Sequence, residues 1–263
     1  IVTKKQAITL AHIAAGTRSF DITMPKEINR LVIDGLSDIL FTAGFSNNSI
    51  ANKEGAELSK VYMVGNILID NIRYNRERVE GMRLNDIDAL AGLPLKEGSY
   101  IVFTLNRKAL LADQENLEKM LRVLCETAGD LPIIAPLRDS AVQVIMALGL
   151  KKNISLHNLH IVKPLNYLQF AYLTSHAQGI VTDSGNVAEE ATFNNIPCIT
   201  LNSYTEHIET VKVGSNVLVG EDAELLRSAF TDMVSGTWKK CGIPDRWDGR
   251  SAERIVQILL EHR

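Results

Sequence analysis

Short apolar runs alternate with helix-like segments along most of the chain. The apolar runs are nearly continuous, as is typical of strands buried on both faces of a parallel sheet, and the segments between them show helical periodicity. Such alternation favours parallel strands joined by crossover helices, so we predict an α/β fold. The predicted strands are 7–13, 38–44, 61–65, 100–105, 131–137, 159–164, 179–183, 198–201 and 216–220, and the predicted helices are 25–36, 66–82, 113–128, 139–148, 166–176, 187–194, 223–234 and 251–261.

The predicted strands fall into two groups. A charged stretch, 73–96, separates the first three strands from the next six. Six strands with their helices make a complete doubly wound domain, whereas three make only part of one. We therefore expect two Rossmann-like domains, the first only partly present in a fragment that enters a strand at residue 7 with no element before it. The expected division is 1–78 for the C-terminal part of the first domain, 79–247 for the second, and 248–263 for a C-terminal helix packing back on the first.

Composition and charge exclude several classes of protein. The 28 basic and 31 acidic residues give a net charge of -3 without a basic block, so we expect no nucleic-acid partner. No apolar run reaches the ~18 residues of a membrane span, and we expect no membrane partner. The three cysteines, Cys125, Cys198 and Cys241, lack the spacing of metal or redox motifs. A cytoplasmic protein without a metal cluster is therefore predicted.

One loop has the features of an anion site. The segment TDSGNVAEEA, 182–191, follows the apolar residues 179–181 and leads into a predicted helix. Ser184 and Gly185 then lie at a helix N-terminus, where backbone N–H groups and the helix dipole favour a phosphate. Glu190, six residues after Ser184, could accept two ribose hydroxyls. Alternatively, Asp183 or Ser184 simply caps the helix, and the loop alone leaves both interpretations open.

Several other stretches belong with this loop. They are HIAAGTR (12–18), PKEINR (25–30), VGNILID (64–70), TEHIE (205–209) and DGRS (248–251). In this order and at nearly this spacing they resemble the motifs H-x-E-A-G-x-R, P-E-E-x-N-R, V-G-N-T-x-x-D, T-E-R-P-E and D-G-x-S of the non-hydrolysing UDP-N-acetylglucosamine 2-epimerases, whose loop reads T-D-S-G-G-x-x-E-E-A. That family has the two-domain GT-B fold. The resemblance covers almost the whole chain.

The resemblance implies a ligand and a reaction. Members bind a UDP-sugar between two domains and invert C2 of the sugar by eliminating UDP and adding it back, without a cofactor, for cell-envelope polysaccharide synthesis. A homodimer is also implied. The matching positions place Ser184 and Gly185 on phosphate, Glu190 on ribose and Phe170 on the base, with Asn186 and His207 also at the substrate. Phe170 has an alternative role in core packing.

The family's catalytic positions are substituted. Ala14 and Lys26 replace two glutamates, and Asn106 replaces a histidine. Alanine transfers no proton, lysine reverses the charge, and asparagine does not titrate. The candidates for catalysis are His12, Glu27 and Asn106, with Arg30, Arg107, Lys108 and His207 nearby. Each has a structural alternative: His12 as a satisfied core histidine, Glu27 and Arg30 as a surface helix pair, and Arg107 and Lys108 as a solvated loop.

Three functions follow from these observations. The first is an epimerase acting on a UDP-sugar, which the fold and the nucleotide loop favour. The second is a UDP-sugar-binding relative that has lost epimerisation and regulates or scaffolds, which the substituted positions favour. The third is a GT-B glycosyltransferase that holds its donor nucleotide with the same serine, glycine and glutamate. Overall similarity favours the first over the third.

Overall fold

The chain folds into two compact units. The computed structural model describes residues 1–262. Unit 1 combines Ile1–Tyr74, Thr205–Gly214 and the chain from Ile243 onward, and unit 2 combines Asn75–Tyr204 and Ser215–Gly242. Segment 205–214 joins unit 1, although no sequence pattern indicates this.

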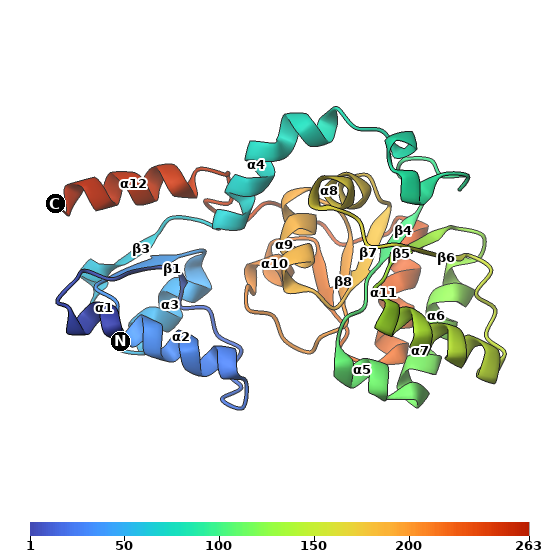
Figure 1. Cartoon of the computed structure of the whole chain (residues 1–263), viewed down its shortest axis with the longest axis horizontal. Coiled ribbons are helices and arrows are strands. Elements are labelled where there is room, and N and C mark those ends of the chain that lie inside the picture. The colour runs from blue at the N-terminus through green and yellow to red at the C-terminus, as the bar shows by residue number, and fades with distance from the viewer. Residues whose placement is uncertain (263) are drawn as a thin grey trace. The chain divides into compact units, whose positions relative to one another are not determined.

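Unit 1 is built on a parallel three-stranded sheet in the order β1-β2-β3 (Figure 1). On one face Leu40 packs with Ala15 and with Ala51 of α3. On the other face Phe41 packs with Ile255 of the last helix. The elements of unit 1 are α1 (Val2–Lys5), β1 (Ala11–Ala15), α2 (Pro25–Leu36), β2 (Ile39–Thr42), α3 (Phe45–Lys53), β3 (Val61–Met63), the start of α4 (Ile67–Glu80), α10 (Glu209–Lys212) and α12 (Ser251–Glu261), with a 3-10 turn at Leu58–Lys60.

Unit 2 contains a parallel six-stranded sheet in the order β6-β5-β4-β7-β8-β9 (Figure 1). The chain builds from β4 toward one edge and then returns to build from β7 toward the other. The pair β4–β7 is therefore a topological switch point, where open α/β sheets bind ligands at the carboxyl ends of their strands. The elements are β4 (Ile101–Phe103), α5 (Lys108–Ala112), α6 (Gln114–Ala128), β5 (Ile133–Pro136), α7 (Asp139–Lys152), β6 (Leu159–Val162), α8 (Tyr167–Ser175), β7 (Gly179–Thr182), α9 (Gly185–Phe193), β8 (Cys198–Thr200), β9 (Asn216–Leu218) and α11 (Ala223–Ser235), with 3-10 turns at Leu84–Asp86 and Asp88–Leu90.

Apolar side chains cover both faces of the larger sheet. Phe103 and Val181 belong to a cluster with α6, α7 and α11. Val102 and Ile180 face the opposite way, into a cluster with α8 and α9. Neighbouring residues of one strand thus enter different clusters, which explains why the strands read as continuous apolar runs.

Local signals set several helix ends. Pro25 occupies the first turn of α2, where its missing N–H removes no helical hydrogen bond. Asp113 accepts from Asn116 N–H (3.1 Å) at the start of α6. Asp222 accepts from the N–H groups of Glu224 and Leu225 (both 2.9 Å) at the start of α11. Such caps satisfy amide groups that have no partner within the helix.

The predicted fold class is confirmed, and all nine predicted strands occur in the structure. The first strand differs in position, because it begins at Ala11 rather than residue 7. The expectation that no element precedes this strand is wrong, because helix α1 lies before it. Between them, Ala7 adopts a left-handed conformation with a φ of 54°. Helix α3 was not predicted, because FSNNSIANK is rich in serine and asparagine and has little apolar periodicity. Helices α5 and α10 were also missed, being a turn or so long. Across residues 1–262, no helix is long and apolar enough to cross a bilayer.

Gly65 lies at a close backbone contact in unit 1. Its φ is +103°, and a Cβ atom added there would lie 2.1 Å from the carbonyl oxygen of Arg246. The next residue, Trp247, is buried, and its Nε1–H donates to the Ala43 carbonyl (3.1 Å). Glycine at this position therefore lets segment 246–247 pack against the chain between β3 and α4.

We expect Gly65→Ala to lower the free energy of unfolding by about 2–5 kcal/mol, because a positive φ costs about 1–2 kcal/mol and backbone overpacking about 1–3 kcal/mol. Gly55→Ala is the matched control. Its φ is +96°, but nothing lies within 4 Å of its added Cβ, so only the backbone cost of about 1–2 kcal/mol applies. Urea unfolding measures both variants, and equal losses would contradict the role of the Arg246 contact.

Candidate functional site

Asp183 joins the two loops at the switch point of unit 2. Its Oδ2 accepts the N–H groups of Asn106 (2.5 Å) and Arg107 (2.6 Å) from the loop after β4. The hydroxyl of Thr104, directly after β4, lies 2.6 Å from that of Thr182, the last residue of β7. The structure therefore brings Asn106 next to the loop that carries Ser184. The Asp183 side chain is used for this link and does not cap α9.

The N-terminus of α9 is open. Ser184 is its N-cap residue but makes no side-chain capping hydrogen bond. The first intrahelical bond runs from Ala188 N–H to the Ser184 carbonyl (3.2 Å), so the amides of Gly185 to Val187 precede the hydrogen-bonded ladder. Nothing lies within 4 Å of a Cβ placed on Gly185. A hydroxyl, several amides without helical partners and a helix dipole thus occur together in an exposed turn, which suits an anion. Asn186, also exposed, lies in the same turn.

Glu190 is a buried carboxylate one turn further along α9. Its residue is 9% exposed, and no hydrogen bond to its carboxylate occurs within residues 1–262. Burial, and then the neighbouring Glu189 carboxylate, raise the pKa of Glu190 to about 7. A buried carboxylate without hydrogen-bond partners has an unfavourable free energy. Hydroxyl donors that reach Glu190 would therefore form stabilising hydrogen bonds with it.

Phe170 lies half-buried on α8, where it packs against the cluster that contains Tyr172 and Ala188. Asn166 and Gln169 exchange hydrogen bonds at the start of α8 and fix that end of the helix. Core packing therefore accounts for part of the Phe170 side chain, and the rest is accessible.

In unit 1, Glu206 binds two cations of α2. Lys26 Nζ lies 2.6 Å from Glu206 Oε1, and the Arg30 guanidinium donates to both carboxylate oxygens at 2.8 Å. Burial by itself would raise the pKa of Glu206, but the hydrogen bonds from Arg30 and Lys26 outweigh it and hold the pKa at about 2. The three side chains form an ionised clamp, in which Lys26 takes part as a partner of Glu206.

Glu27 is buried and holds the loop that precedes α2. Its carboxylate accepts from the N–H groups of Ser19 (2.9 Å) and Phe20 (2.8 Å) and from the Ser19 hydroxyl (3.0 Å). Burial opposes ionisation, yet these three donors lower the pKa of Glu27 below its ordinary value. Glu27 is 3% exposed, so it is not a surface residue, although Arg30 lies 3.8 Å from it. It acts as a fixed acceptor for the loop.

His12 belongs to a buried charge network. Its Nδ1 lies 2.5 Å from Asp34 Oδ1, and Asp34 Oδ2 accepts from Gly16 N–H (3.0 Å) and lies 2.7 Å from Arg18. Burial raises the pKa of Asp34, but the hydrogen bonds from His12, Gly16 and Arg18 outweigh it and the net shift is downward. One ring nitrogen of His12 is therefore occupied. Ala14, where the motif has glutamate, lies in a left-handed conformation with a φ of 66°.

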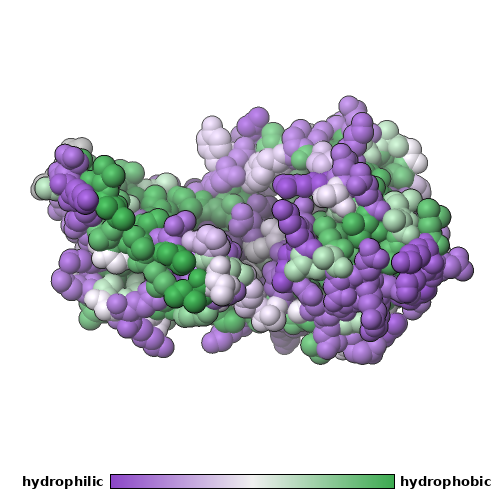
Figure 2. All heavy atoms as spheres, turned by 60° about the horizontal axis from the view of Figure 1, so that its bottom comes forward, coloured by the Kyte–Doolittle hydropathy of each residue, from purple (hydrophilic) through white to green (hydrophobic). Residues whose placement is uncertain are grey.

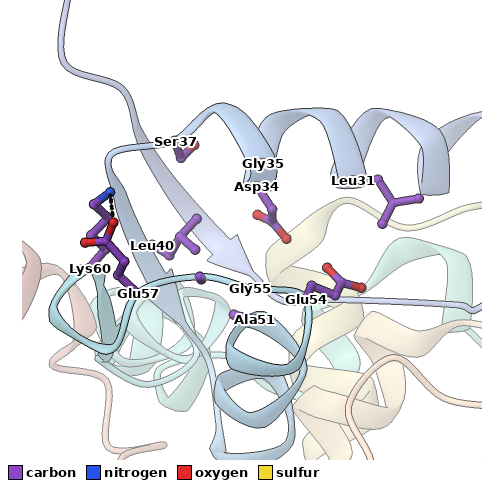
Figure 3. Close-up of a pocket in the computed structure, with 11 residues that line it drawn as sticks. Leu31, Asp34, Gly35, Ser37, Leu40, Ala51, Glu54, Gly55, Glu57 and Lys60 are labelled. Atoms are coloured by element: carbon purple, nitrogen blue, oxygen red, sulfur yellow. Dashed lines mark hydrogen bonds and ion pairs between the residues drawn. The ribbon is translucent and has the colours of Figure 1, made fainter.

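His207 and a cavity both belong to unit 1. His207 is 8% exposed and packs edge-on against Trp247, with ring centres 6.0 Å apart. A cavity of about 490 Å³ opens between α2 and α3, and none of its lining residues belongs to loop 182–191. Figure 3 shows the Asp34 and Glu54 carboxylates directed toward this space and Lys60 paired with Glu57. Nowhere in residues 1–262 do three or more His, Cys, Asp or Glu side chains gather as a metal would require.

Comparison with known proteins identifies the family. The sequence profile of UDP-N-acetylglucosamine 2-epimerase matches residues 1–260. The UDP-N-acetylglucosamine 2-epimerase of Methanocaldococcus jannaschii is 35% identical over 273 residues, covering 98% of this chain and 70% of that protein. The chain belongs to the UDP-N-acetylglucosamine 2-epimerase family.

Solved epimerase structures share its fold. A crystal structure of the M. jannaschii epimerase in complex with UDP-GlcNAc and UDP is 34% identical, has a TM-score of 0.82, and covers 99% of this chain and 71% of that chain. The Neisseria meningitidis epimerase bound to UDP-GlcNAc is 26% identical, with a TM-score of 0.84 and coverage of 98% and 71%. A Pseudomonas aeruginosa relative, 32% identical over 264 residues, covers 99% of this chain and 70% of its own length and is a UDP-2,3-diacetamido-2,3-dideoxy-D-glucuronate 2-epimerase.

Sequence reasoning missed the residues that hold the candidate site together. Asp183 was considered only as a cap of α9, and Glu206 and Asp34 were given no role. An aspartate directly after a buried strand at the switch point is the one signal that could have indicated the Asp183 link. The partners of Glu206 and Asp34 are distant in sequence and become visible only in the fold.

Glu190→Gln should change how stability depends on pH. The folded pKa of about 7 lies above the ordinary value of 4.5. Protonated Glu190 therefore contributes stability that is fully present below the ordinary value and is lost as the pH rises through about 7. Relative to Glu190→Gln, the wild-type free energy of unfolding should fall by on the order of 2 kcal/mol from about pH 5 to about pH 8. Urea titrations at several pH values measure this.

Glu115→Gln is the control, because the Glu115 side chain is 80% exposed and pairs only with Lys119. Its pH profile should match the wild type. A wild-type profile parallel to that of Glu190→Gln would show that Glu190 titrates at its ordinary value.

Proposed function

We propose that this chain binds UDP at the loop after β7 and carries out, or belongs to an enzyme that carries out, inversion at C2 of a UDP-N-acetylhexosamine. The supporting observation is the open N-terminus of α9, which lies one turn from the buried, unpartnered carboxylate of Glu190. An anion site followed by an acceptor for hydroxyls suits the diphosphate and the ribose of UDP. The GT-B-type fold shared with epimerase structures supports the same ligand.

In this proposal the nucleotide loop holds the leaving group. A base removes the proton at C2 while the C1–O bond breaks and its electron pair leaves with UDP. Re-addition of UDP at C1, with protonation of C2 on the opposite face, gives the inverted sugar. Negative charge develops on the diphosphate, and the Ser184 hydroxyl and the amides from Gly185 onward stabilise it through the dipole of α9. Glu190 binds ribose and Phe170 supports the base.

The contacts made by the candidate acid–base groups favour a second candidate function. Ala14 carries no titratable group, and Lys26 is occupied in the ion pair with Glu206 at 2.6 Å. His12, Glu27 and Asn106 remain the proposed candidates, although Glu27 and one nitrogen of His12 are held by other groups. The ion pair of Lys26 supports a UDP-sugar-binding relative that does not epimerise.

The substrate class follows from what the relatives share. The named substrates are UDP-N-acetylglucosamine and a UDP-diacetamido-dideoxy-glucuronate. Both combine UDP with an acetamido sugar. We infer a UDP-acetamido sugar as ligand.

Incubation of the protein with UDP-N-acetylglucosamine in deuterated water tests the proposal, with NMR following inversion and deuterium at C2. Ser184→Ala and Glu190→Ala should each weaken UDP binding by about tenfold or more, because a hydrogen bond to a charged group contributes about 1.5–3 kcal/mol. Calorimetry measures the binding. If UDP does not bind, or both variants bind like wild type, the nucleotide site is misassigned.

Restoring the motif separates the two functions. The double variant Ala14→Glu, Lys26→Glu returns both glutamates and should raise C2 exchange by about 10²-fold or more if only acid–base groups are missing. Glu57→Gln, an exposed change in the same unit, is the control. Wild-type turnover at a rate that the double variant does not improve would place the catalytic groups elsewhere. UDP binding with no turnover in either protein supports the non-epimerising relative.

We also infer a cytoplasmic homodimer. All three cysteines in the described chain are unpaired, as expected in a reducing compartment. Helix α2 turns Ile28, Leu31 and Val32 outward, 38–49% exposed, while its charged Glu27 and Asp34 are buried. Figure 2 shows apolar surface over much of its left-hand part, where Figure 1 draws the elements of unit 1. An apolar helix stripe of this kind suits a subunit contact.

Light scattering after size exclusion should report a dimer for wild type and a monomer for Leu31→Glu, because a buried, unpaired charge at the contact costs several kcal/mol. Leu225→Glu is the control, since Leu225 is also exposed but lies on α11 of unit 2. Dissociation of the control, or a dimer of Leu31→Glu, would place the contact elsewhere.

A further inference from the structure

The connection from β8 to α10 passes from one unit to the other. Residues up to Tyr204 belong to unit 2, and Thr205–Gly214 belongs to unit 1. We call residues 201–209 the strap. Its two ends make different polar contacts, each within a single unit.

The first end of the strap is bonded to the loops at the switch point. Asn202 Nδ2 donates to the Asp183 carbonyl (3.2 Å). The Arg107 guanidinium donates to the Leu201 carbonyl (3.0 Å) and to Asn202 Oδ1 (2.8 Å). Arg107 and Asp183 are themselves joined through the Arg107 amide (2.6 Å). These contacts attach the strap to the loop that leads into α9.

The second end of the strap is bonded to α2 and α3. Glu206 accepts from Lys26 and Arg30 of α2, as described above. Glu209 Oε1 accepts from Ser46 N–H (2.8 Å) and from the Ser46 hydroxyl (2.6 Å) in the first turn of α3.

The strap also replaces a missing helix cap. The N-cap residue of α3 is Gly44, which has no side chain to bond the first amides. A Cβ on Gly44 would lie 2.8 Å from Glu209 Oε1, so glycine makes room for the carboxylate of the strap. Helix α3 therefore depends on the strap for the cap that its own sequence lacks.

Only Ser203 and Tyr204 separate Asn202 from Thr205, where the second end begins. Two residues span at most ~7 Å when extended, so such a tether has little slack. Thr205 Oγ1 and His207 N–H, 3.2 Å apart, close a tight turn directly after it. A displacement at one end is thus passed to the other.

We propose that the strap couples the nucleotide loop of unit 2 to the N-terminal ends of α2 and α3, because one end of the strap is bonded to each of them and only two residues separate the ends. The inference rests on the proposed function only for the identity of the ligand, UDP. Coupling of this kind is reciprocal: loosening either end loosens the other. Lys26, where the resembled motif has glutamate, adds an ion pair to the contacts of the second end.

Amide hydrogen exchange of the purified chain, followed by mass spectrometry, tests the coupling in both directions. Glu206→Gln weakens the second end and should speed exchange at the Asn106 and Arg107 amides about fivefold or more. Asn202→Ala weakens the first end and should speed exchange at the Ser46 amide by a similar factor. Glu57→Gln, which neutralises an exposed glutamate of unit 1, should change neither. If each variant affects only its own end, the coupling is overturned.

Added UDP gives an independent readout. In the wild type it should slow exchange at residues 185–187 and also at Ser46, and Asn202→Ala should remove the effect at Ser46 alone. Protection of 185–187 without any change at Ser46 refutes the coupling and leaves nucleotide binding intact. If UDP protects neither site, the nucleotide assignment fails, and the two variants without ligand still decide whether the ends are coupled.

Discussion

The topological switch point between β4 and β7 determines where unit 2 can bind a ligand. Parallel strands end at one edge, and at a reversal the loops after two adjacent strands diverge to opposite faces. The Asp183 carboxylate bridges these loops by accepting two amides of the neighbouring loop. Because that carboxylate serves the scaffold, the start of α9 remains uncapped. An uncapped helix N-terminus is therefore a consequence of how the switch point is held together.

Periodicity in the sequence was sufficient for the fold and insufficient for the site. All nine strands were predicted because burial on both faces leaves apolar runs with no polar interruption. Helix α3 was missed because its segment has little apolar periodicity and because its capping group, Glu209, lies far along the chain from Ser46. The same separation hid the partners of His12 and Lys26. Residues that act through long-range pairs leave no local pattern, so only the fold shows what they contact.

One substituted motif position, Lys26, has a structural partner. Lys26 pairs with Glu206, which Arg30 also binds. A glutamate at position 26, as in the resembled motif, would instead be repelled by the Glu206 carboxylate. Glu27, adjacent in sequence, holds the preceding loop as an ionised acceptor. Together these side chains form a network of compensating charges in and around the first turns of α2. Such a network holds its side chains in fixed positions and fixed charge states, which suits a structural role better than proton exchange with a substrate.

The environment of Glu190 has a consequence for the thermodynamics of ligand binding. Near neutral pH this carboxylate is partly protonated, because its pKa lies at about 7. Ribose hydroxyls that donate to it would favour the ionised form, so nucleotide uptake would expel a proton into the solvent. The measured heat would then vary with the ionisation enthalpy of the buffer, and the site would discriminate between a nucleotide and a plain diphosphate partly through that proton. The first turn of α9 and one buried carboxylate would thus make recognition of the ribose and diphosphate of the nucleotide dependent on pH.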